Sequence, residues 1–139
     1  MANYQNLGLT YNRDTLFIGS HLGSDSSVVP LWVAPCKCEL ISIKLLNGAA
    51  IAAHTENYGT LTITNELTDA SGTTALTSDT TKTVAVTALV ERTLTLTSTA
   101  ANKIVQRGEV LSATWTEAGT GADLTNASII IEWAPQANK

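Results

Sequence analysis

Charged and aromatic side chains are scarce in this sequence. Of its 139 residues, 14% are Asp, Glu, Lys or Arg and 5% are aromatic. The eight Lys and Arg residues are scattered and form no basic stripe that would neutralise phosphates, so the sequence predicts no nucleic-acid partner. The longest apolar runs, such as 129–131, are far shorter than the roughly 20 residues of a membrane-spanning helix. We therefore expect no membrane partner either.

The first residues also lack the basic start and apolar stretch of a signal peptide. We expect a soluble chain that is not exported by the usual route.

Cysteine and histidine are few, which limits metal and redox chemistry. Cys36 and Cys38 are the only cysteines, and His21 and His54 stand alone in the sequence. On a strand, the C-x-C spacing leaves the two Cβ atoms well beyond the roughly 4 Å that an unstrained disulfide needs. Zinc prefers four ligands, and the sequence has no second C-x-x-C or H-x-x-x-H pair. We expect a structural, buried or half-buried thiol pair, with no metal and no cofactor.

Sequence patterns typical of catalysis are missing as well. The Gly-Ser-Asp-Ser-Ser cluster at 23–27 lacks the strand–turn–helix context that exposes a catalytic serine. The segment 119–121, Gly-Thr-Gly, is not followed by a helical pattern, which a phosphate-binding loop requires. The twelve carboxylates are dispersed and suggest no acid–base pair. The sequence predicts a protein that is not an enzyme.

Threonine, by contrast, is abundant and regularly placed. It fills 22 positions, and in segments such as 61–64 and 93–97 it alternates with apolar residues. Successive side chains of a strand point to opposite faces, so these segments bury one face and expose a hydroxyl-rich one. Within 61–64 the two threonines should be more exposed than Leu61 and Ile63, or the reverse if the register places both faces inside. The pattern predicts an antiparallel β-sandwich or barrel.

The chain divides into two parts by composition. Residues 1–27 are polar and rich in Gly, Asn and Ser, and we interpret them as an extended N-terminal arm. Residues 28–139 form the predicted β-sandwich domain. We expect eight strands, at 28–33, 39–46, 59–66, 83–87, 92–98, 103–106, 109–116 and 127–134. Short strands separated by turn residues predict an all-β fold with two antiparallel sheets, similar to a jelly roll.

The N-terminal arm contains isolated large apolar side chains. Such side chains, in a segment without its own core, either fold back on the sandwich or dock on another chain, and the sequence leaves both alternatives open. We select as candidate partner-binding residues Tyr4, Tyr11, Leu16, Phe17 and Ile18.

Several segments of the β region, taken together, resemble a known family. The segment 31–40, LWVAPCKCEL, joins an apolar strand, a proline and a second strand. The segments HTENYGTL at 54–61 and GEVLS at 108–112 follow, and GTGADL at 119–124 precedes a final strand. Over roughly residues 28–135 this pattern resembles the decoration or cement proteins, small β-sandwich proteins encoded beside the major capsid protein of tailed bacteriophages.

The resemblance implies a structural role in a virion. It implies a homotrimer on the outside of the capsid, at three-fold or quasi-three-fold positions, that binds the phage major capsid protein and stabilises the shell. Residues 1–27 would then clamp the capsid. The protein would be made in the host cytoplasm and end on the capsid surface of the virion. The alternative is a receptor- or carbohydrate-binding head domain of a phage fibre or tail.

Overall fold

The computed structural model describes residues 11–21, 28–120 and 122–136. Strands make up most of this part of the chain, which confirms the all-β prediction. The strands are β1 (Asn12–His21), β2 (Val28–Val33), β3 (Cys38–Leu46), β4 (Tyr58–Asn65), β5 (Thr74–Thr80), β6 (Arg92–Thr93), β7 (Ile104–Val105), β8 (Val110–Ala118) and β9 (Leu124–Pro135). A short 3-10 helix, η1, spans Ala100–Lys103. None of the described helical segments is long and apolar enough to cross a bilayer.

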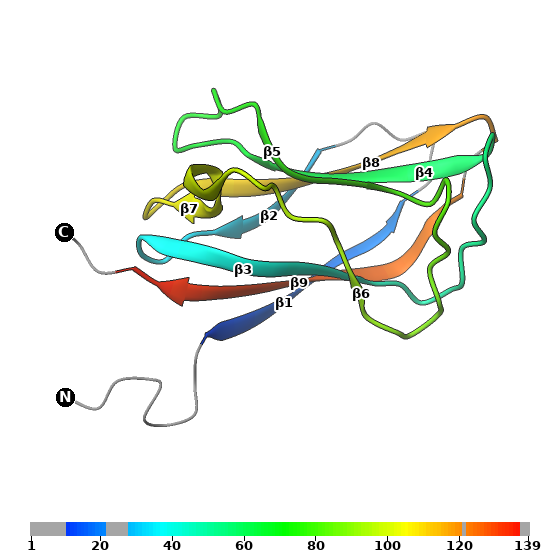
Figure 1. Ribbon diagram of the computed structural model, residues 1–139, viewed down its shortest axis with the longest axis horizontal. Coiled ribbons are helices and arrows are strands. Elements are labelled where there is room, and N and C mark those ends of the chain that lie inside the picture. Colours follow the sequence, from blue (N-terminus) through cyan, green and yellow to red (C-terminus); the bar gives the residue numbers. More distant parts are fainter. Residues whose placement is uncertain (1–10, 22–27, 121, 137–139) are drawn as a thin grey trace.

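The strands form two antiparallel sheets that pack face to face (Figure 1). Sheet A has the order β1-β9-β3-β6, with β7 also paired to β3, and sheet B has the order β2-β8-β4-β5. The pairs β1–β9, β2–β8, β3–β6 and β4–β5 nest within one another along the chain, as in one long hairpin. Rolling that hairpin places alternate pairs in alternate sheets, which is the jelly-roll arrangement. The predicted two-sheet, jelly-roll-like sandwich is therefore confirmed.

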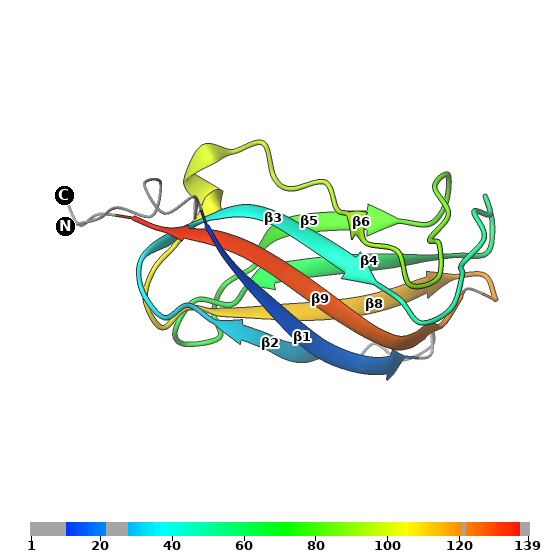
Figure 2. The ribbon, with the colours of Figure 1, turned by 90° about the horizontal axis from the view of Figure 1, so that it is seen from below.

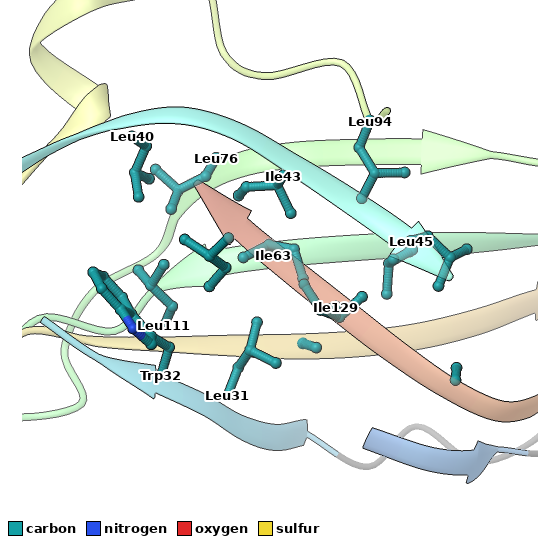
Figure 3. Close-up of a cluster of buried hydrophobic side chains, with 14 of the residues drawn as sticks. Leu31, Trp32, Leu40, Ile43, Leu45, Ile63, Leu76, Leu94, Leu111 and Ile129 are labelled. Carbon is teal, nitrogen blue, oxygen red and sulfur yellow. The ribbon is translucent and has the colours of Figure 1, made fainter. Parts of the chain in front are cut away.

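The core lies between the sheets and is built from every second strand residue. In β4, Leu61 and Ile63 are buried, whereas Thr62 and Thr64 are half-exposed, so the predicted alternation is confirmed. Figure 3 shows side chains from both sheets meeting in this core, among them Leu40, Ile43, Ile63, Leu76, Leu111 and Ile129. Each such side chain stabilises the fold by about 1.5–3 kcal/mol on burial.

The connection from β5 to β6 differs from the sequence prediction. Residues 83–87 were predicted as a strand and 92–98 as another, but only 92–93 form one, as β6. Val86 and Leu96 make isolated bridges instead, to Ile51 and Thr77 respectively. The segment passes from sheet B to sheet A, so its alternating apolar side chains reach the core without a continuous strand partner.

Strand β5, Thr74–Thr80, was not predicted. Its sequence, TALTSDT, is polar and lacks an alternating apolar pattern. It forms a strand because it pairs along the length of β4 and buries Leu76.

Strand β1 changes the interpretation of the N-terminal segment. The prediction that strands begin at Val28 is wrong, because Asn12–His21 pairs antiparallel with β9 and forms one edge of sheet A (Figure 2). Leu16 and Ile18 pack against the core. For this part of residues 1–27 the structure therefore shows the first alternative, in which the segment folds back on its own sandwich. Residues 1–10 and 22–27 lie outside the described residues.

Candidate interaction surfaces

The carboxylate of Asp14 ties β1 to both sheets. Its Oδ2 accepts hydrogen bonds of 2.9 Å from the indole Nε1 of Trp32 in β2 and from that of Trp133 in β9. The two indole rings lie with their centroids 5.8 Å apart. One carboxylate oxygen thus connects an edge strand to a strand of each sheet, which holds β1 in a defined position.

Side chains alternate between the two faces of β1, so some candidate partner-binding residues face the core and others face outward. Leu16 and Ile18 point inward and pack against the core, so their assignment to a partner surface is corrected here. Phe17 points to the outer face of sheet A, where 70% of it is exposed, and Tyr11, just before the strand, is 44% exposed. Tyr4 lies outside the described residues. Tyr11 and Phe17 therefore remain as accessible aromatic residues along one edge strand.

Charged side chains form a network across the outer face of sheet A. Glu91, at the end of the β5–β6 connection, pairs with Arg13 in β1 and, at 3.4 Å, with Lys44 in β3. Lys44 Nζ also lies 2.8 Å from Glu132 Oε1 in β9, and the Ser42 hydroxyl donates a 2.6 Å hydrogen bond to the same oxygen. The network links three neighbouring strands and the β5–β6 connection, and it supports β1 from the outer side.

Glu132 is the most buried group of this network, at 4% exposure. Its pKa is lowered from 4.5 to about 2, first by the hydrogen bond from Lys44 and then by that from Ser42. The hydroxyl of Tyr11 also hydrogen-bonds this carboxylate and contributes to the lower pKa. Tyr11 is thereby oriented on the outer face.

Acidification is expected to destabilise the fold through Glu132. Because its pKa is lower in the folded state, its contribution is complete above about pH 5 and is lost as the pH falls through 4.5 toward 2. We expect a loss on the order of 2–3 kcal/mol over that window. Urea unfolding at a series of pH values measures it.

The Glu132→Gln variant should lose much of this pH dependence. A matched control is Glu117→Gln, which removes a carboxylate from β8 in the other sheet. The control should show the same dependence of unfolding free energy on pH as the wild-type protein. If Glu132→Gln also showed that dependence, the assigned role of Glu132 would be incorrect.

The two cysteines are free thiols at and just before the start of β3, as predicted. Cys38 begins β3 and is fully buried, whereas Cys36 is half-buried. The pKa of the Cys38 thiol is raised to about 11, first by burial and then by the nearby Cys36 and Glu109. A thiol with this pKa stays protonated at neutral pH, which makes it a poor nucleophile and metal ligand.

The two histidines make only local hydrogen bonds that the structure describes. The Nδ1 atom of His54 accepts the backbone N–H groups of Glu56 and Asn57, and a ring nitrogen of His21 lies 2.6 Å from the carbonyl oxygen of Ile18. Within the described ranges, no three His, Cys, Asp or Glu side chains gather as a metal site would require.

No protein-family model matches this sequence, and no curated protein is significantly similar to it. The functional argument therefore rests on the fold and on the surface residues described above.

Proposed function

We propose that this protein is a non-enzymatic structural protein of a phage virion, a decoration protein that binds the outside of the capsid and stabilises it. The observation that supports the proposal most directly is the presence of two exposed aromatic side chains on the outer side of sheet A, Phe17 in β1 and Tyr11 just before it. Aromatic side chains are enriched at the centres of protein–protein interfaces, and these two are held on an ordered edge of the sheet. The jelly-roll strand order agrees with this role, since the arrangement recurs in viral capsid and lectin domains.

Contacts on both sides of β1 hold the proposed binding surface in place before a partner binds. The Asp14 hydrogen bonds and the Glu91 network fix β1 from its inner and outer sides. A surface that is already ordered loses little conformational entropy on binding, so more of the contact energy remains as affinity.

The proposed assembly is a homotrimer at three-fold or quasi-three-fold positions of the capsid, bound to the phage major capsid protein. Trimers place three copies of the β1 surface on one shell, and many trimers on one capsid make binding multivalent. Each contact can then be modest while the whole layer stays bound. In this proposal the protein is made in the host cytoplasm and ends on the capsid surface.

The Phe17→Ala variant is expected to weaken binding to capsid shells by about 10- to 100-fold. This corresponds to losing the burial of one aromatic side chain, about 1.5–3 kcal/mol. The measurement is co-sedimentation of the purified protein with empty shells of the major capsid protein that the proposal makes its partner. The fold should be retained, because Phe17 is largely exposed.

Val84→Ala is the matched control for this experiment. Val84 is also exposed, but Arg92 of β6 binds its carbonyl oxygen, which places it at the sandwich edge opposite β1. Equal shell binding by wild-type and Phe17→Ala protein would contradict the assigned surface. Binding of the wild-type protein to purified glycans, with none to shells, would favour the receptor-binding alternative.

A further inference from the structure

A groove of about 430 Å³ opens on the outer face of sheet B. Its floor is apolar and comes from Val28 and Pro30 of β2 and from Val110 of β8. Leu111 lies in the core, so its neighbour Val110 faces outward, as the alternation of a strand requires. The turn between β4 and β5, drawn in green in Figure 1, forms one wall through Leu67 and Ala70. The volume is within the range of about 300–1,000 Å³ that ligand pockets occupy.

The wall of the groove is held rigidly by backbone and side-chain hydrogen bonds. The N–H of Glu66 donates to the Val110 carbonyl at 2.8 Å, and the N–H of Val110 donates to the Leu67 carbonyl at 3.1 Å. The N–H of Leu67 also donates to Asn65 Oδ1 at 2.9 Å. Leu67 and Ala70 both have positive φ, at 61° and 60°, which is unfavourable for residues with a Cβ. Strain of this kind persists where the surroundings fix it, and it is concentrated at functional sites.

Two carboxylates, Glu66 and Asp69, lie beside this apolar floor. The Ser112 hydroxyl donates a hydrogen bond to Glu66 Oε1 and orients that group. Asp69 Oδ1 accepts hydrogen bonds from the hydroxyl and the N–H of Ser71, which lower the pKa of Asp69 below its ordinary value. No Lys, Arg or His is present among the described residues that line the groove. The groove is therefore apolar with a negative rim.

We propose that this groove binds an extended segment of another protein through a lysine or arginine side chain. The methylene groups of that side chain would cover Val28, Pro30 and Val110, and its cation would lie beside Glu66 and Asp69. Lys and Arg combine an apolar stem with a charged end, which is the combination that the groove complements.

The proposal is independent of the capsid-binding role. The groove is on sheet B, whereas Tyr11 and Phe17 are on the outer face of sheet A. A protein with both surfaces can hold two partners at once. A soluble peptide tests the groove without capsid shells. The groove proposal and the capsid-binding proposal can therefore be refuted independently of each other.

The test is a titration of the ¹⁵N-labelled full chain with two acetylated and amidated pentapeptides, followed by NMR. One peptide is Ala-Val-Lys-Val-Ala, and the other has norleucine in place of lysine, which keeps the stem and removes the charge. We expect the lysine peptide to shift the amide signals of Leu67, Ala70 and Val110. We expect the norleucine peptide to bind about five-fold more weakly, as for the loss of one partly exposed ion pair.

Two double variants test whether Glu66 and Asp69 cause the preference for the lysine peptide. The double variant Glu66→Gln/Asp69→Asn keeps the acceptor oxygens for Ser112 and Ser71 but removes both charges. It should bind the two peptides equally. The control Glu56→Gln/Glu117→Gln also removes two charges, but from the ends of β4 and β8 that lie away from the groove. It should keep the preference for lysine.

Three results would overturn the proposal. The first is the absence of shifts at the groove with about 10 mM lysine peptide, and the second is equal binding of the two peptides by the wild-type protein. The third is loss of the lysine preference in the control double variant, which would assign the effect to overall charge. The wild-type comparison of the two peptides stays decisive even if the groove variant fails to fold.

Discussion

Replacing Asp14 with alanine is expected to lower the free energy of unfolding by about 2–5 kcal/mol. The change leaves the indole N–H groups of Trp32 and Trp133 without their acceptor, and both tryptophans are buried. Each buried donor that loses its partner destabilises a protein by about 1–3 kcal/mol. Urea unfolding followed by tryptophan fluorescence measures the loss and also reports on these two rings.

Asp14→Asn is the matched control, because its carbonyl oxygen still accepts both hydrogen bonds while the charge is removed. We expect a clearly smaller loss than for Asp14→Ala. Amide hydrogen exchange in β1 should become faster in Asp14→Ala, since the strand loses its link to both sheets. Equal stabilities of Asp14→Ala and the wild-type protein would show that this carboxylate does not anchor β1.

Gly59→Ala is expected to destabilise the protein by about 3–5 kcal/mol. A Cβ at this position would overlap the indole ring of Trp115, which is buried on the neighbouring strand β8. The backbone cannot simply move away, because the Gly59 N–H donates to Thr81 Oγ1 at 3.0 Å. Either the indole is displaced from the core or the β4–β8 pairing is distorted, and both losses are large.

Thermal unfolding of Gly59→Ala beside Thr60→Ala measures this effect. Thr60 is the next residue of β4 and is half-exposed, so its substitution should change the stability by no more than about 0.5 kcal/mol. A Gly59→Ala protein as stable as Thr60→Ala would mean that the indole of Trp115 has room to move.

The alternation of threonine with apolar residues was sufficient to predict the sandwich. In β4, which pairs with a strand on each side, one face is core and the other is hydroxyl-rich, so the period of two is visible in the sequence. Residues 83–87 show the same alternation but do not form a strand, because the chain there passes between the two sheets. A local pattern reports which side chains are buried, and not whether a partner strand is available.

Strand β1 could not be recognised in the same way. The run Leu16-Phe17-Ile18 is apolar on both faces, because Phe17 remains exposed on the outer side, and this conceals the period of two. Its partner strand β9 is also distant in sequence, since Asp14 and Trp133 are 119 positions apart. Only the folded topology shows which of the apolar residues face the core.

The candidate surfaces were predictable only in part. Tyr11 and Phe17 were identified from the sequence as large apolar groups in a polar segment. The network around Glu91 was not, because Arg13 and Glu91 are 78 positions apart. The groove on sheet B was missed for a related reason, since β2, β8 and the β4–β5 turn come together only when the hairpin is rolled into two sheets.

The most direct test of the proposed function is a cryo-electron microscopy reconstruction of the phage virion that we propose contains this protein. We predict trimeric density for the jelly roll at three-fold or quasi-three-fold positions over the whole capsid, with the outer face of β1 and Phe17 against the major capsid protein. A shell without this density, with the protein found instead in a few copies on a tail or fibre, would contradict the proposal.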